Sequence, residues 1–146
     1  METAAFLERL SRKQAVIGVV GLGYVGLPLV LTFARKGLRL IGFDIDAEKI
    51  RKLRAGESYI RHIPADGLKA LVDSGQLTPT TDFADARQCD AVLLCVPTPL
   101  NKNREPDVSY IVNTARSLAP HLQRGQLIVL ESTTYPGTTD ELLRQE

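Results

Sequence analysis

The stretch AVIGVVGLGYVGLPLVLTFARKGLRLIGFDID, residues 15–46, decides the fold of this chain. It opens with an apolar run, residues 15–20, whose β-branched side chains are typical of a strand buried on both faces of a sheet. The glycines of residues 21–23 end that run, residues 24–36 have the length of a helix, and residues 38–43 form a second apolar run. The stretch therefore predicts a strand, a tight turn, a helix and a second, parallel strand.

The alternation of strands and helices continues along the chain. Further strands are expected over residues 77–81, 91–96 and 126–130, and further helices over residues 4–12, 47–55, 65–73, 82–87 and 108–118, with a last one near residue 138. This alternation predicts an α/β fold of the Rossmann type: a doubly wound, mainly parallel sheet with helices on both faces.

Composition limits the kinds of partner. Lys and Arg (18) nearly balance Asp and Glu (17), so bulk charge predicts neither a nucleic-acid nor a membrane partner. Residues 15–34 carry no charge, but glycines and Pro28 interrupt them, which favours a strand, turn and helix over a membrane span. Cys89 and Cys95 lack metal-ligand and disulfide spacing, so we expect structural roles for them, no metal site and a reducing, cytoplasmic setting.

Residues 21–26, GLGYVG, match the pattern G-x-G-x-x-G between a buried strand and a helix. In this context Gly21 allows the sharp turn, Gly23 allows a pyrophosphate to approach the backbone, and Gly26 allows the helix to pack closely on the sheet. The pattern predicts a dinucleotide site.

The acid at the end of the second strand points to the kind of dinucleotide. The backbone N–H groups of Tyr24 and Val25, near the positive end of the helix dipole, are expected to face the pyrophosphate. Asp44 is expected to accept hydrogen bonds from the adenosine ribose and to repel the extra phosphate of NADP, which favours NAD, although Lys49 and Arg51 nearby weaken that preference. The alternative is a plain tight turn with a locally capping aspartate. The complete strand–helix–strand context favours cofactor binding.

Two later segments also follow expected strands. In a doubly wound sheet, ligands bind beyond the carboxyl ends of the strands, so residues 97–107 and 131–139 fall on the ligand side. Pro97 stiffens the first of these turns and Thr98 presents a hydroxyl towards the cofactor. Ordinary turn chemistry, with Ser and Thr as local caps, is the alternative, and position alone leaves both interpretations open.

Together these segments resemble the N-terminal, NAD-binding domain of the UDP-glucose/GDP-mannose dehydrogenase family over nearly the whole chain. The motifs that carry the resemblance are GLGYVGLPL (21–29), GFDID (42–46), CVPTPL (95–100), EPD (105–107) and ESTTYPGTT (131–139). Within the family, residues 58–60 and 101–107 are most similar to the bacterial UDP-N-acetylglucosamine or UDP-N-acetylmannosamine 6-dehydrogenases.

The resemblance implies oxidation of the C6 alcohol of a UDP-N-acetylhexosamine to a carboxylate with two NAD in turn. The cofactor-binding residues that it implies are Gly21, Gly23, Tyr24, Val25, Gly26, Asp44, Lys49, Pro97, Thr98 and Thr133. Asp44 and Lys49 would surround the adenosine ribose, and Thr98 and Thr133 the nicotinamide half. Thr133 would lie closest to the chemistry, in a supporting catalytic role only.

The resemblance also implies that residues 1–146 are a fragment. The family's nucleophilic cysteine and its catalytic lysine and asparagine belong to later segments, as do the central helical domain and the C-terminal nucleotide-sugar domain. We therefore expect this chain to bind NAD without oxidising the UDP-sugar substrate of the full-length enzyme. The full-length protein is expected to be a homo-oligomer, because family members pair through the central domain.

Other interpretations stay open at this point. The chain could be the NAD domain of a UDP-glucose dehydrogenase, of another dehydrogenase such as the 6-phosphogluconate or hydroxyacyl-CoA type, or a non-catalytic nucleotide-binding module. Residues 97–99 and 131–139 argue against the more distant dehydrogenases, and a final helix cut off at Glu146 argues against the module. The sequence assigns no role to His62, Lys102 or Arg104.

Overall fold

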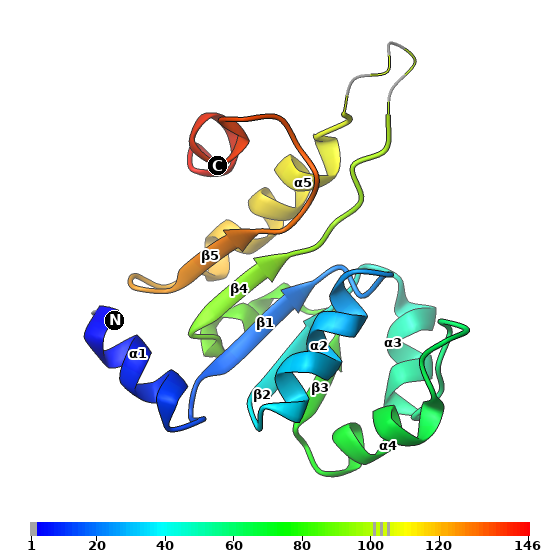
Figure 1. Ribbon diagram of the computed structural model, residues 1–146. Coiled ribbons are helices and arrows are strands. Elements are labelled where there is room, and N and C mark those ends of the chain that lie inside the picture. The colour runs from blue at the N-terminus through cyan, green and yellow to red at the C-terminus, as the bar shows by residue number, and fades with distance from the viewer. Residues whose placement is uncertain (1–2, 101, 103, 105) are drawn as a thin grey trace.

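A five-stranded parallel sheet forms the centre of the molecule (Figure 1). The computed structural model describes residues 3–100, 102, 104 and 106–146. The strands are β1 (Val16–Val20), β2 (Arg39–Phe43), β3 (Leu77–Thr80), β4 (Ala91–Leu94) and β5 (Leu127–Leu130), in the spatial order β3-β2-β1-β4-β5. The chain therefore winds outward from β1 in both directions, and the predicted Rossmann-type doubly wound sheet is confirmed.

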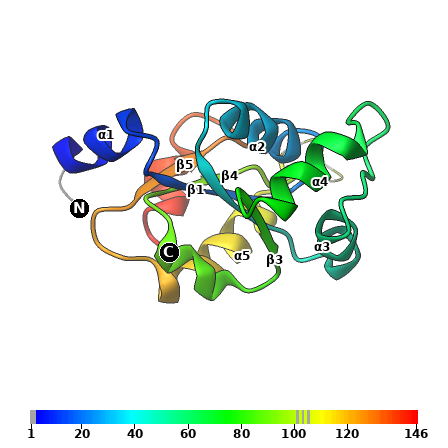
Figure 2. The same cartoon turned by 90° about the horizontal axis from the view of Figure 1, so that it is seen from below.

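Helices cover both faces of this sheet. They are α1 (Thr3–Ser11), α2 (Gly26–Arg35), α3 (Ala47–Arg54), α4 (Ala65–Asp73) and α5 (Ser109–Leu118), with short 3₁₀ turns η1 (Phe83–Gln88) and η2 (Ala119–His121) and a π-helical turn η3 (Thr139–Leu143). Figure 2 shows α2 and α5 on opposite sides of the sheet. Within the described part of the chain, no helix has both the length and the apolar composition needed to cross a membrane.

The apolar side chains of β1 contribute to two hydrophobic cores, one on each face of the sheet. Ile17 and Val19 belong to the buried cluster beneath α2, α3 and α4, whereas Val16 and Val20 belong to the cluster beneath η1 and α5. Successive side chains of a strand point to opposite faces, so a strand covered on both faces must be apolar throughout. This is why β1 has no polar position.

Three predicted boundaries are wrong by two or three residues. The last helix, expected to be cut off at Glu146, ends as a π-helical turn at Leu143. The helix after the glycine turn begins at Gly26 and not at Tyr24, so Tyr24 and Val25 belong to the turn itself. Pro28 is then the third helical residue, where a missing N–H leaves the helix intact.

The predicted strand 91–96 ends at Leu94, because its neighbour β1 ends at Val20 and the chain then turns away. Cys95, expected in the middle of a strand, thus begins the loop after β4.

Candidate functional site

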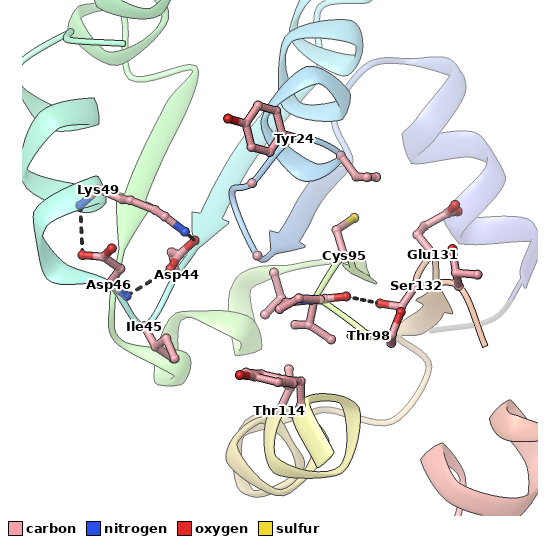
Figure 3. A pocket seen from close by; sticks show the side chains of 18 of the residues that line it. Tyr24, Asp44, Ile45, Asp46, Lys49, Cys95, Thr98, Thr114, Glu131 and Ser132 are labelled. Carbon is pink, nitrogen blue, oxygen red and sulfur yellow. Dashed lines mark hydrogen bonds and ion pairs between the residues drawn. The ribbon is translucent and has the colours of Figure 1, made fainter. Parts of the chain in front are cut away.

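A cavity of about 700 Å³ opens at the carboxyl ends of the strands, at the point where the chain direction across the sheet reverses between β1 and β4. Figure 3 shows Asp44 and Lys49 on one side of this cavity, Thr98 and Ser132 on the other, and Thr114 on α5 between them. The predicted cofactor residues that line it are Gly21, Gly23, Tyr24, Val25, Asp44, Lys49, Pro97, Thr98 and Thr133. The fold thus gathers almost the whole predicted set around one cavity.

The glycines of the turn have distinct steric environments. Gly21 has φ +89°, and a Cβ there would lie 2.7 Å from the carbonyl oxygen of Cys95. A Cβ on Gly26 would collide with the carbonyl oxygen of Gly21, so Gly26, which does not line the cavity, allows α2 to pack against the turn. Around Gly23, its two neighbours in the chain apart, no heavy atom of the described residues lies within 4 Å of an added Cβ. This open space lets a ligand approach the backbone at Gly23.

The start of α2 is available to a negatively charged ligand. Tyr24 and Val25 are 76% and 54% exposed at the rim of the cavity. No side chain among the described residues caps the amino end of α2, and its first turn holds no acidic residue. The N–H groups there carry the positive end of the helix dipole, which suits a phosphate group.

Asp44 is buried, with 6% of its surface exposed, and accepts three hydrogen bonds. Its Oδ2 accepts the backbone N–H of Leu22 at 2.9 Å and the Lys49 ammonium at 3.1 Å, and its Oδ1 accepts the backbone N–H of Asp46 at 3.0 Å. A carboxylate has about four acceptor positions. One position on Oδ1 is therefore left for a ligand hydroxyl, and the Leu22 bond shows that Asp44 also fastens the glycine turn to the end of β2.

Apolar side chains form a part of the cavity wall that the sequence analysis did not identify. Ile45 is 79% exposed directly after Asp44, and Phe83 lies against Phe43 with ring centroids 5.9 Å apart and planes 8° apart. Tyr110 and Thr114 of α5 also line the cavity. They are four residues apart and therefore lie on one face of the helix. These surfaces suit a flat ring. The spacing on α5 is the one sequence signal that could have indicated them.

The hydroxyl cluster after β5 divides into two roles. Ser132 donates to the carbonyl oxygen of Val96 at 2.7 Å and so ties the loop after β5 to the loop after β4 (Figure 3). The buried Thr138 donates to the carbonyl oxygen of Tyr135 at 2.7 Å. Thr138 thus has the local turn role of the alternative interpretation, whereas Ser132 joins two loops and lines the cavity together with Thr98 and Thr133.

Both cysteines are buried and neither is prepared to act as a nucleophile. Burial, followed by the negative charges of Asp90 and Asp85, raises the pKa of Cys89 to about 12. Burial, followed by the charge of Glu131, raises the pKa of Cys95 to about 11. Both thiols are therefore protonated at neutral pH, as structural cysteines would be. Among the described residues, no group of His, Cys, Asp and Glu could hold a metal ion.

The residues to which the sequence assigned no role differ in their distance from the site. His62 lies against the ring of Tyr24, with centroids 6.3 Å apart. The cavity lining includes neither Lys102 nor Arg104, although the structure describes both. Asn101 and Glu105, which the quoted motifs include, lie outside the described residues.

The strand order, the glycine turn between β1 and α2, and the acid at the end of β2 define a dinucleotide-binding domain of the Rossmann class. The family model described as "UDP-glucose/GDP-mannose dehydrogenase family, NAD binding domain" matches residues 15–146. The chain therefore belongs to the NAD-binding domain of this family, and the predicted cofactor and family are confirmed.

Individual relatives agree with this assignment. The chain is 36% identical over 129 residues to the UDP-N-acetyl-D-glucosamine 6-dehydrogenase of Pseudomonas aeruginosa, which covers 88% of this chain and 30% of the relative. It is 43% identical over 127 residues to the NDP-N-acetyl-D-galactosaminuronic acid dehydrogenase of Ralstonia nicotianae, covering 86% of this chain and 29% of the relative. The solved UDP-D-ManNAc dehydrogenase of Pyrococcus horikoshii superposes with a TM-score of 0.82 at 37% identity, covering 89% of this chain and 31% of that one. The chain spans about a third of the length of the curated relatives that it matches.

Proposed function

We propose that this chain is the NAD-holding domain of a nucleotide-sugar 6-dehydrogenase, which oxidises the C6 alcohol of a UDP-N-acetylhexosamine to a carboxylate with two NAD in turn. The observation that carries the proposal is the assembly of the glycine turn, Asp44, Lys49, Thr98 and Thr133 around one cavity at the carboxyl ends of the strands. The names of the relatives support an N-acetylhexosamine nucleotide as the substrate class.

The order of the chemical groups around the cavity supports NAD as its ligand. The N–H groups of Tyr24 and Val25 hold the pyrophosphate, because the amino end of α2 is uncapped. The free acceptor position of Asp44 receives an adenosine ribose hydroxyl, and Lys49 lies beside it. Ile45 contacts the adenine from the exposed edge of the cavity. This assignment places the adenosine half beside β2 and α3.

The opposite side of the cavity receives the nicotinamide half. Thr98 and Thr133 present hydroxyls there from loops that the Ser132–Val96 hydrogen bond joins. When bound, NAD supplies the acceptor for the hydride that leaves the sugar carbon. Thr133 orients groups near that carbon in a supporting role. Pro97 stiffens the loop that carries Thr98.

The chain supplies cofactor binding and not the covalent chemistry. Cys89 and Cys95 are buried with raised pKa values, which supports placing the nucleophile outside residues 1–146. The greater length of the relatives supports the same division, with a central helical domain and a nucleotide-sugar domain in the full-length protein. We propose that this protein is a cytoplasmic homo-oligomer that binds a UDP-sugar and neither nucleic acid nor membrane.

Calorimetric titration of the 146-residue chain tests this function. The chain is titrated separately with NAD, NADP and UDP-N-acetylglucosamine. Binding of NAD, weaker binding of NADP and no binding of the sugar nucleotide are expected from a cofactor domain. Binding of the sugar nucleotide without NAD, or no binding of any of the three, would overturn the proposal.

A further inference from the structure

The segment between α3 and α4, residues 57–64, contacts the glycine turn although it lies outside the G-x-G-x-x-G pattern. It is fixed to the body of the domain by Ile60 and Ile63, which are 3% and 7% exposed within the core beneath α2, α3 and α4. Ser58 adds a local bond, because its hydroxyl donates to the carbonyl oxygen of Ile60 at 3.0 Å. The segment is thus a fixed support at the rim of the cavity.

Tyr59 connects this support to the turn. Its hydroxyl donates to the backbone carbonyl oxygen of Leu22 at 2.6 Å, and its side chain is half-buried. Burial, followed by the charges of Asp44 and Asp46, raises the pKa of Tyr59 well above its usual range. The hydroxyl therefore keeps its proton at any physiological pH and remains a donor.

Leu22 is held on both of its backbone polar groups. Its N–H donates to Asp44 Oδ2 at 2.9 Å, its carbonyl oxygen accepts from Tyr59, and its side chain is fully buried. The two partners come from separate parts of the chain, the end of β2 and the segment between α3 and α4. Together they fix the two peptide planes that flank Leu22.

The second of these planes leads directly to the phosphate-facing part of the turn. In a trans peptide the carbonyl oxygen and the following N–H point in opposite directions. A carbonyl of Leu22 held by Tyr59 therefore turns the N–H of Gly23 away from Tyr59. Gly23 lines the cavity, and the space where a Cβ would lie is open, so a ligand can approach its backbone. Without the tyrosine hydroxyl, the Leu22 carbonyl would lose this donor, and the peptide plane would be held less firmly before a ligand arrives.

We propose that Tyr59 is a positioning residue for the pyrophosphate subsite: its hydroxyl holds the Leu22–Gly23 peptide in the orientation that receives a diphosphate. The inference rests on the proposed function, because it concerns the same cavity. A second contact from the same segment supports it, since His62 lies against the ring of Tyr24 in the turn. The affinity for diphosphate ligands thus depends on a side chain outside the glycine fingerprint.

The test compares Tyr59→Phe with the unaltered chain. Phenylalanine keeps the ring and its packing and removes only the hydroxyl. Tyr135→Phe is the matched control, because Tyr135 is 41% exposed and lies outside the cavity lining. Two readouts are used: hydrogen–deuterium exchange of the Leu22 amide, which donates to Asp44, without ligand, and the Kd values for NAD, ADP and adenosine.

The loss of one neutral hydrogen bond predicts a change of about fivefold to tenfold. In Tyr59→Phe, exchange of the Leu22 amide is expected to accelerate and the Kd values for NAD and ADP to rise by that factor. The Kd for adenosine, which has no diphosphate, is expected to change less than about twofold, and Tyr135→Phe is expected to match the unaltered chain.

Unchanged exchange, or an equal loss of affinity for adenosine and ADP, would overturn the positioning role, because Tyr59 would then be only a part of the cavity wall. The proposed function fails separately, if the unaltered chain binds no NAD. In that case the exchange rates and the ADP titration still decide whether Tyr59 positions the turn.

Discussion

Asp44 Oδ2 accepts the backbone N–H of Leu22 across 2.9 Å, so the acid that ends β2 is also a structural bond to the turn that follows β1. In Rossmann-type domains, the acidic residue at the end of the second strand hydrogen-bonds the adenosine ribose. Here the carboxylate is 6% exposed and already has three donors before any ligand is present. Fold stability therefore depends on this side chain, and under the proposed function the affinity for the cofactor depends on it as well.

Asp44→Asn is expected to lower the free energy of unfolding by about 1–3 kcal/mol, because the new amide NH₂ must face either the buried N–H of Leu22 or the part-buried N–H of Asp46. Urea denaturation at pH 7 measures the change. Asp46→Asn is the matched control. Asp46 caps α3 from an exposed position by accepting the N–H of Glu48 at 2.9 Å, and asparagine caps about as well as aspartate. Equal destabilisation of the two variants would contradict the structural role of Asp44.

Lys49 is expected to moderate the preference for NAD over NADP. Its ammonium lies 3.1 Å from Asp44 Oδ2 and offsets the charge that would repel a 2′-phosphate. Lys49→Met should therefore weaken NADP binding more than NAD binding and widen the ratio of the two Kd values by about threefold to tenfold. Lys52→Met, on the same helix but paired with Glu48, should leave the ratio unchanged. A narrower ratio in Lys49→Met would contradict the assigned position of the ribose.

Alanine substitutions at three glycines should separate folding from binding. Gly26→Ala places a Cβ against the carbonyl oxygen of Gly21, and overpacking of this kind typically costs about 1–3 kcal/mol. Gly23→Ala meets no heavy atom within 4 Å, so its unfolding free energy should stay near that of the unaltered chain while its NAD affinity falls. Gly67→Ala, also in open space but within α4, should stabilise the domain by about 0.5–1 kcal/mol without affecting NAD. Urea denaturation and calorimetric titration give both quantities. Normal NAD affinity in Gly23→Ala would show that no phosphate approaches this part of the turn.

The cysteines predict how stability changes at high pH. Folding raises the pKa of Cys89 to about 12 and of Cys95 to about 11, from an ordinary thiol value of 9.0. Because folding favours the protonated thiols, this stabilisation is complete below the unfolded pKa and is lost as pH rises through the native values. The urea midpoint should fall between about pH 9 and 11.

The same protonation governs thiol reactivity. Alkylation by iodoacetamide at pH 8 should be slower in the native chain than in urea by at least about a hundredfold, because only the thiolate reacts. Cys89→Ala combined with Cys95→Ala should make the alkaline fall in stability shallower. Rapid alkylation of the native chain would contradict the burial of both thiols.

The ion pair beneath α1 predicts an asymmetry between its two partners. Arg9 donates to both carboxylate oxygens of Asp90, at 3.1 and 2.9 Å, and Asp90 also accepts the backbone N–H of Val16 at 2.8 Å. Arg9→Met, which removes a 42% exposed partner, should cost less than about 1 kcal/mol. Asp90→Ala should cost about 1–3 kcal/mol, because the N–H at the start of β1 loses its acceptor. Equal losses in urea denaturation would show that the ion pair, and not the backbone bond, is what Asp90 contributes.

The sequence predicts best where local chemistry decides the structure. Helix α4 lies at the expected residues 65–73, and Asp46 caps α3 as predicted. Periodic apolar side chains and capping groups act over a few residues, so they are visible without the fold. The end of β4 could not be placed in the same way, since the apolar run continues through Cys95 and Val96 while the end of the strand is set by its neighbour β1.

The site was predictable as a set of positions but not as a set of contacts. Parallel strands bring their carboxyl ends together, so Asp44, Thr98 and Thr133 could be assigned to one edge from chain order alone. The bond from Tyr59 to Leu22 joins residues 37 positions apart. No local pattern encodes such a contact, because it depends on how the segment between α3 and α4 folds back over the turn.

The central position of β1 has a consequence for biosynthesis. β1 pairs with β2 on one edge and with β4 on the other, where Ile17 lies opposite Ala91. A ribosome adds roughly 5–20 residues per second, so the second edge of β1 waits about 4–15 s for its partner to be synthesised. During that interval the nascent chain exposes an unpaired apolar strand, the kind of edge that invites aggregation. The emerging first half of the domain is therefore expected to need chaperone protection until β4 leaves the ribosome.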